Sequence, residues 1–319
     1  MMEWYDILGL SVAVLAGICL FVLLIALVCF LKVFYSPKRK VLKEYEFEYP
    51  PGKIYEPYYD KMLAWMHDLR TRPQEKVSVK SYDGLTLRGT YYEYSPDAPV
   101  ELLFHGYQGN AERDLSAAVE RCAKLGRSAL LIDQRGSGKS DGHVITFGAK
   151  ESKDCLTWIE FATQKFGKDR KLMIGGVSMG AATVLLASGE ELPDNVVCVM
   201  ADCGYSSAKE IIKKVVREMH LPPNLVYPFI KLGAKIFGGF DLDSATPKEA
   251  VKRSKKPIIL LHGDDDDFVP FAMSEEIYNA CPGKRKLVKL DGAGHGLAYP
   301  KQPDAYVNGL RDFAVECGF

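Results

Sequence analysis

The sequence predicts an α/β fold, in which a mostly parallel eight-stranded sheet carries helices on both faces and follows an N-terminal transmembrane helix. Two observations lead to this prediction. From Val77 onward, short β-branched runs alternate with helical patterns, and strands separated by helices are joined by crossovers that make them parallel. Before that region, the run from Ile7 to Leu31 holds no charged residue and is long enough for a helix to cross a bilayer.

Residues 1–35 are predicted to be a retained membrane anchor. A helix over Ile7–Leu31 would cross a hydrocarbon core of ~30 Å with some tilt. A secretory signal peptide has a basic start and a shorter apolar core, whereas Glu3 and Asp6 precede this run. A buried core helix is the alternative, but such helices rarely stay uncharged over this length.

Charge and cysteine usage favour a cytoplasmic domain after the anchor. The basic residues next to the span lie on its C-terminal side: Lys32, Lys38, Arg39, Lys40 and Lys43. None of the eight cysteines follows a disulfide-framework or Cys-x-x-Cys spacing, which favours a reducing compartment. Lys+Arg and Asp+Glu are both 41, so the formal charge is +0 and no nucleic-acid partner is expected.

Residues 36–75 are predicted to be a linker that contains one amphipathic helix. Four prolines make its first part irregular, and apolar residues then recur near a 3.6-residue period from Tyr58 to Arg70. Its apolar face could rest on the bilayer or on the protein's own core, and the core is the commoner fate of such faces.

Residues 76–319 hold the alternating pattern. The predicted strands are Val77–Ser81, Leu85–Tyr92, Val100–His105, Ala129–Asp133, Leu172–Val177, Val196–Asp202, Pro257–His262 and Lys286–Leu290. Asp83-Gly84 is a hairpin signal between the first two. The predicted helices are Ala111–Leu125, Lys150–Phe166, Gly180–Gly189 and Ser274–Ala280. In such sheets the chemistry lies at the C-terminal ends of the strands.

The stretch "IDQRGSGKS", residues 132–140, superficially resembles a nucleotide-binding phosphate loop. That loop needs a glycine five positions before Gly138, where this chain has Asp133. Lys139 and Ser140 also lead into another loop rather than into a long helix. The sequence therefore predicts no nucleotide partner.

A nucleophile candidate lies at a strand-to-helix junction, in "GVSMG". Gly176-Val177-Ser178-Met179-Gly180 is G-x-S-x-G in its required context, where glycines let strand and helix approach closely and a strained turn holds the serine hydroxyl out. Ser178 could instead be an ordinary helix N-cap. The interpretation therefore depends on whether the sequence also supplies a base and an acid for this serine.

A serine hydroxyl needs a base to remove its proton and an acid to orient that base. Four aspartates, Asp264 to Asp267, follow one late strand, and His295 lies in a glycine-rich loop after the last. The chain order Ser178, Asp, His295 is the one expected on this type of sheet.

An oxyanion hole needs two backbone N–H groups, one after the nucleophile and one in the loop after the third strand. Met179 and Tyr107, the latter in "HGYQGN", occupy those positions. Such a glycine-rich stretch could also be a plain tight turn. Four features at four strand ends favour the functional interpretation.

From about Val77 to Phe319, this set of motifs resembles the α/β-hydrolase superfamily, and specifically bacterial membrane-anchored serine hydrolases related to ABHD and BEM46-like esterases. "HGYQGN" resembles the oxyanion loop, "GVSMG" the nucleophile elbow and "GAGHG" the base loop. The acid motif H-G-x-x-D-x-x-V-P, aligned on "HGDDDDFVP", selects Asp266. "DQRGSGKSDG" is similar to a structural loop of the family. The resemblance also implies a small helical cap over the site, inserted at about residues 204–255, whose apolar residues suit an acyl pocket or merely pack the cap onto the sheet.

The sequence therefore predicts a serine hydrolase that cleaves acyl esters, small or lipid-like, with Ser178, Asp266 and His295 as catalytic triad. No cofactor or metal is expected, since no histidine has a ligand spacing. A peptidase, amidase or thioesterase could use the same triad, and a catalytically silent membrane scaffold is a further alternative.

Overall fold

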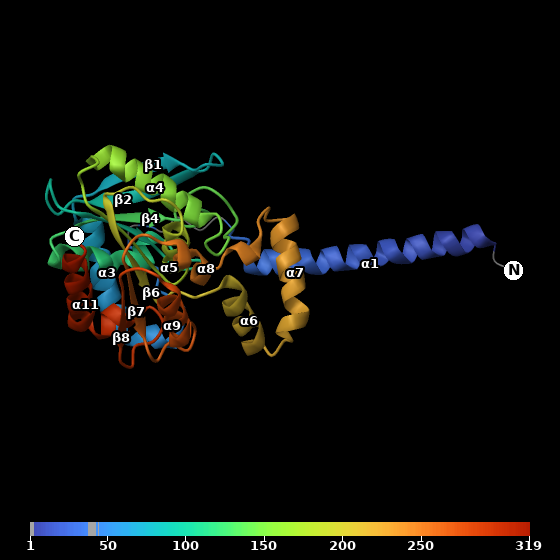
Figure 1. The fold of residues 1–319 in the computed structure, drawn as a ribbon. Helices are drawn as coiled ribbons and strands as arrows, with labels where there is room; N and C mark the ends of the chain where they lie inside the picture. The colour runs from blue at the N-terminus through green and yellow to red at the C-terminus, as the bar shows by residue number, and fades with distance from the viewer. Residues whose placement is uncertain (1–2, 38–42, 44) are drawn as a thin grey trace.

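The structure is a computed structural model that describes residues 3–37, 43 and 45–319. Eight strands form one sheet in the order β1-β2-β4-β3-β5-β6-β7-β8 (Figure 1). The strands are β1 (Glu75–Lys80), β2 (Thr86–Tyr92), β3 (Val100–Phe104), β4 (Ser128–Asp133), β5 (Leu172–Val177), β6 (Val196–Asp202), β7 (Ile258–Gly263) and β8 (Arg285–Leu290).

The sheet is antiparallel at one edge and parallel elsewhere. β1 pairs with β2 and β2 with β4 in antiparallel register, while all pairs from β4 to β8 are parallel. The Ser81 N–H donates to the Leu85 carbonyl and closes the predicted hairpin turn. The predicted mostly parallel eight-stranded sheet is confirmed, although β1 is shifted toward the N-terminus relative to the prediction.

Helices cover both faces of the sheet (Figure 1). One face is covered by α4 (Glu151–Phe166), α5 (Met179–Ser188) and α9 (Phe271–Ala280) around the fully buried Trp158. The other is covered by α2 (Tyr59–Thr71), α3 (Ala111–Lys124), α10 (Ala298–Lys301) and α11 (Pro303–Glu316). Each face has its own apolar core, as expected when crossovers place helices on both sides of parallel strands.

The amphipathic helix of the linker, α2, packs on the protein itself. Its buried side chains are Met62, Met66 and Leu69. The Trp65 indole N–H donates to Glu120 of α3 at 2.6 Å. The prediction that this face meets the core rather than the bilayer is therefore confirmed.

Two helices inserted between β6 and β7 form a cap, and the N-terminal helix packs against them. The cap helices are α6 (Ala208–Glu218) and α7 (Pro223–Ile236), followed by short turns and α8 (Pro247–Ala250). The N-terminal helix α1 (Trp4–Val33) extends away from the sheet and is a candidate membrane span by length and composition (Figure 1). Of the basic residues predicted to set its orientation, Lys38, Arg39 and Lys40 lie outside the described residues.

Several helices were not predicted from the sequence. The longest of these are α7 and α11, and α11 carries a clear signal, because its buried side chains recur at helical spacing: Tyr306, Val307, Leu310, Phe313 and Ala314. α9 also begins three residues before its predicted start, directly after Pro270. A proline fixes φ and often stands next to a helix start, so its position was informative.

Candidate active site

Ser178 lies in a sharp turn between β5 and α5. Its backbone has φ 55° and ψ −114°, a conformation that few residues other than glycine adopt. A Cβ added to Gly176 would lie 2.2 Å from the Gly180 carbonyl carbon, and one added to Gly180 would lie 2.0 Å from the Phe104 carbonyl oxygen. Only glycines fit at these two positions. The strand and the helix therefore approach each other as closely as the motif predicted.

The structure brings the three predicted catalytic side chains together. His295 Nε2 lies 2.9 Å from Ser178 Oγ, and His295 Nδ1 lies 2.7 Å from Asp266 Oδ2. Ser178 follows β5, Asp266 follows β7 and His295 follows β8, so the C-terminal ends of three parallel strands at one edge of the sheet supply all three. The arrangement is a continuous hydrogen-bonded chain from a carboxylate through an imidazole to a hydroxyl.

A second histidine holds the carboxylate. His262 Nε2 lies 3.1 Å from Asp266 Oδ2, and the Phe268 and Val269 N–H groups donate to Asp266 Oδ1. Burial on its own would raise the pKa of Asp266, but the hydrogen bonds from His262 and His295 outweigh it and hold that pKa at about 2. The carboxylate is therefore ionised at neutral pH and can stabilise a positive charge on His295.

The two predicted oxyanion residues come from the start of α5 and from the loop after β3. Met179 is the first residue of α5, so its N–H is one of the first-turn amides that have no partner inside the helix. Tyr107 follows Gly106 in the loop after β3. The Gly106 N–H donates to Asp114 Oδ2 at 3.1 Å, and a Cβ on Gly106 would lie 3.6 Å from Ser178 Cβ. The loop thus lies against the nucleophile candidate.

Ser178 and His295 line a cavity of about 810 Å³. Much of its lining is apolar and comes from strands and helices of the sheet: Leu103, Leu115, Val177 and Met200, with Trp65 of α2. A strap of residues 48–55, between α1 and α2, covers part of the cavity and contributes Ile54 and Tyr55. The sequence of this strap indicates only a linker, since it has no periodicity and three prolines lie in or near it.

An ion pair and a hydrogen bond connect the strap to residues next to the loop that carries Tyr107. Glu48 accepts hydrogen bonds from Arg113 at 3.1 Å and from Asn110 at 3.0 Å. Arg113 Nε also donates at 2.6 Å to Asp114, whose other oxygen receives the Gly106 N–H. The strap is thereby connected to the loop that carries Tyr107.

One further group of ligand-type side chains surrounds the site. Cys203 Sγ, Asp266 and His295 offer ligand atoms within 4.8 Å of one another. A thiol binds a metal as the thiolate, and burial raises the pKa of Cys203 well above its usual value. Asp266 and His295 are already hydrogen-bonded to each other, so these residues suit an acid–base pair better than a metal site. The expectation of no metal stays a prediction.

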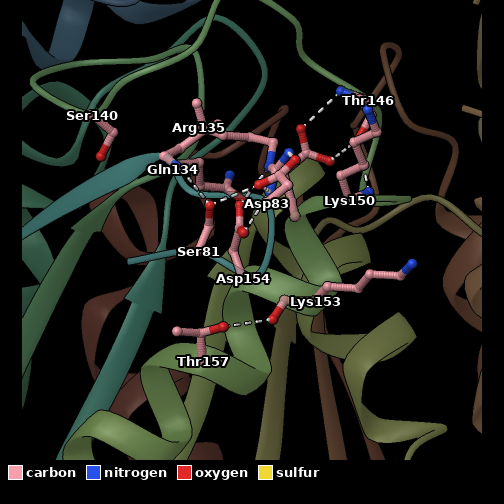
Figure 2. Close-up of polar contacts among 12 residues, drawn as sticks. Ser81, Asp83, Gln134, Arg135, Ser140, Thr146, Lys150, Lys153, Asp154 and Thr157 are labelled. Carbon is pink, nitrogen blue, oxygen red and sulfur yellow. Dashed lines mark hydrogen bonds and ion pairs between the residues drawn. The ribbon is translucent and has the colours of Figure 1, made fainter. Parts of the chain in front are cut away.

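The "DQRGSGKSDG" stretch forms a loop held by internal bonds rather than a phosphate cradle. Asp133 accepts the Ala111 and Lys139 N–H groups, both at 2.9 Å. Arg135 lies between Asp154 and Asp83 and donates to both carboxylates (Figure 2). Its first residues thus tie β4 to α3 and α4, which agrees with the predicted structural role.

Comparisons with known proteins agree with this fold. A family model described as the α/β hydrolase fold matches residues 102–239. An uncharacterized protein of Bacillus subtilis, YqkD, is 26% identical over 237 residues, which are 74% of this chain and 77% of that protein. Protein bem46 of Schizosaccharomyces pombe is 25% identical over 253 residues, 78% and 76% of the two chains. An esterase structure from Pyrococcus furiosus matches with a TM-score of 0.65 at 20% identity, covering 89% of this chain and 98% of that one.

The family model and the solved structure together show that the chain has the α/β-hydrolase fold. Within that class the chain is similar to the ABHD and BEM46-like proteins, as its motifs predicted. These similarities support hydrolase activity. A fold of this kind hosts many reactions, so the bond that is cleaved has to be argued from the site.

Proposed function

We propose that this protein is a serine hydrolase that cleaves carboxylic esters through an acyl-enzyme. The observation that carries the proposal is the hydrogen-bonded chain Asp266–His295–Ser178, which ends at the wall of an apolar cavity. Ser178 Oγ attacks the acyl carbonyl carbon while His295 Nε2 takes the hydroxyl proton. Asp266 orients His295 and stabilises the imidazolium that forms.

The remaining steps use the same residues. The Tyr107 and Met179 N–H groups stabilise the negative oxygen of the tetrahedral intermediate. When that intermediate collapses, the C–O bond to the alcohol breaks and His295 gives its proton to the departing oxygen. A water molecule, deprotonated by His295, then attacks the acyl-serine, and the acid is released with Ser178 restored.

The cavity supports an acyl group of apolar character, small or lipid-like. Its volume of about 810 Å³ lies within the range of ~300–1,000 Å³ typical of small-molecule sites. The proposed chemistry needs no cofactor. An amide or thioester could be cleaved on the same triad, so a panel of esters, thioesters and aminoacyl amides that share one acyl group would rank the three bond types.

The central test is Ser178→Ala in the full-length protein. Hydrolysis of a p-nitrophenyl ester and labelling by a fluorophosphonate probe should both fall to background, because the nucleophile is gone. Ser95→Ala, in the loop between β2 and β3, is the matched control and should keep both signals. Unchanged labelling in Ser178→Ala would overturn the assignment, and a wild type that neither labels nor turns over would favour the silent scaffold.

We propose that α1 is a retained single-pass anchor and that the catalytic domain is cytoplasmic. The basic residues Lys32 and Lys43, which lie on the domain side of the helix, support this orientation. An impermeant maleimide should fail to label the partly exposed Cys317 in intact cells and should label it after lysis. Labelling before lysis would reverse the orientation.

A further inference from the structure

Helix α7 of the cap has two apolar sides, and only one of them is covered by the described parts of the chain. The covered side packs against α1 and α6 through Tyr227, Ile230, Gly233 and Ala234. The other side carries apolar residues at helical spacing: Leu225, Phe229, Leu232 and Ile236. Leu225 is 64% exposed and Ile236 is also exposed.

The exposed apolar surface continues into the turn between the cap helices. Met219 is 63% exposed there, and Leu221 is exposed beside it. At the other end of α7, the partly exposed ring of Phe237 lies 5.8 Å from that of Phe30 in α1. We call the exposed residues Met219, Leu221, Leu225 and Ile236 the cap face.

Helix α7 lies across α1 at a defined level (Figure 1). The crossing point is Gly233, where an added Cβ would lie 2.4 Å from the Ala26 carbonyl oxygen. Between Trp4 and Phe21, α1 is exposed on all sides. Burial by the cap begins after that stretch, with Ala26 and Phe30. The free part of α1 therefore lies on one side of α7 and the catalytic domain on the other.

This level matches the boundary of a bilayer that α1 would span. Asp6 must stay outside the hydrocarbon, so the span begins at Ile7. Within the uncharged run Ile7–Leu31, about 20 helical residues suffice to cross the core when the helix is not tilted, and counting them from Ile7 ends at Ala26. Ala26 is the residue that meets Gly233 of α7. α7, which lies across α1 there, would thus be in the plane of the membrane interface.

We propose that the cap face is a membrane-docking surface that rests in the interface of the bilayer spanned by α1. Besides its apolar residues, the segment 208–236 holds six basic residues and two acidic ones. A helix with an apolar face and basic flanks is suited to the boundary between acyl chains and anionic headgroups. The occupant is the lipid surface itself.

Docking in this way would bring the catalytic cavity close to the lipids, and this step rests on the proposed function. Lys214 of α6 donates to the Asp267 carbonyl, beside the exposed Phe268 at the cavity wall. The Tyr107 hydroxyl donates at 2.8 Å to the Val33 carbonyl at the end of α1. The cavity wall is thus joined to both the cap and the anchor, and the substrates would be acyl esters that reside in the bilayer.

Tryptophan quenching tests the docking without any need for activity. Full-length protein with Trp4→Phe is reconstituted into vesicles that contain a phospholipid brominated near the headgroup. Leu225→Trp should lose at least about twice as much emission as Tyr94→Trp, an exposed control near the opposite edge of the sheet. Ile236→Trp, on the cap face, should behave like Leu225→Trp. Equal quenching at all three positions would overturn the proposal.

A substrate comparison tests the consequence for catalysis. In Leu225→Asp, hydrolysis of a short water-soluble ester should stay at the wild-type rate, because Leu225 lies outside the cavity. Hydrolysis of a lipid ester held in vesicles should fall at least about tenfold, while Val315→Asp, an exposed change on α11, should have no effect. Equal rates on vesicles would refute delivery from the bilayer. If the wild type cleaves neither ester, the proposed function fails, and the quenching result still decides the docking.

Discussion

Replacing Arg135 with methionine should destabilise the fold by about 3–5 kcal/mol. Arg135 is 3% exposed, and its Nε and Nη2 atoms each lie 2.6 Å from an oxygen of Asp154 (Figure 2). Methionine keeps much of the apolar length of the side chain but removes the cation. The Asp154 carboxylate would then be buried without a partner, which is the costly outcome for a buried ion pair.

The second partner of Arg135 contributes less. Asp83 accepts from Nη1 at 2.9 Å and from Nη2 at 3.1 Å, but its side chain is 34% exposed. Solvent screening limits the contribution of such an ion pair to the free energy of unfolding to about 1 kcal/mol. Asp83→Asn should therefore cost about 1 kcal/mol, well below the cost of Arg135→Met.

The double variant Arg135→Met with Asp154→Leu gives the decisive comparison. Removing both charges leaves no unpaired ion in the buried part of the site, since Asp83 is partly exposed, so this protein should be more stable than Arg135→Met alone by about 2 kcal/mol or more. Urea unfolding of the full-length protein in detergent can be followed by the fluorescence of the buried Trp158, one helical turn beyond Asp154. A double variant less stable than Arg135→Met, or an Arg135→Met loss below about 1 kcal/mol, would refute the reasoning.

Three further predictions concern the site. Because the pKa of Asp266 is about 2 in the folded protein and ordinarily 3.8, its ionisation contributes roughly 2 kcal/mol above pH 5 that is lost as the pH falls toward 2. The stability gap between wild type and Asp266→Asn, measured by urea titration, should shrink over that range, and a constant gap would contradict this. Burial raises the pKa of Asp202 to about 6, so ionisation there lowers stability as the pH rises from 4 to 6, by about 3 kcal/mol. Above pH 6, Asp202→Asn should therefore have a higher free energy of unfolding than the wild type in the same urea titration. Equal stability of the two proteins at pH 8 would contradict this prediction. Gly180→Ala should lower the melting temperature sharply because its Cβ would lie 2.0 Å from a carbonyl oxygen, whereas Gly283→Ala meets nothing within 4 Å and should have little effect.

The site residues that could be predicted from the sequence are those that belong to short motifs at strand ends. Ser178 and His295 stand between or near glycines, and the structure brings them within hydrogen-bond distance of each other. Asp266 could be separated from the three neighbouring aspartates only by the family resemblance. Its geometry gives the physical reason, since the following turn directs two N–H groups at that one carboxylate, and the imidazoles of His262 and His295 also lie within hydrogen-bond distance of it.

Residues that reach the site only because of the path of the folded chain have no recognisable pattern in the sequence. Ile54 and Tyr55 reach the cavity because the strap crosses over it, and nothing in the irregular segment 48–55 indicates that path. His262 lies within hydrogen-bond distance of both Asp266 and Ser274. Its support of the acid depends on how the chain turns after β7, which periodicity cannot show.

The path of the strap has a practical consequence for anyone preparing this enzyme. Single-pass proteins are commonly made water-soluble by deleting the anchor together with the connector that follows it. Here such a deletion would remove Ile54, Tyr55 and the Glu48 contacts to Arg113 and Asn110. The shortened protein would have a wider, wetter cavity, and its substrate preferences would describe a different enzyme. A cut ahead of residue 46 would keep the strap residues that line the cavity, but would remove the Val33 carbonyl that accepts the Tyr107 hydroxyl at the cavity wall.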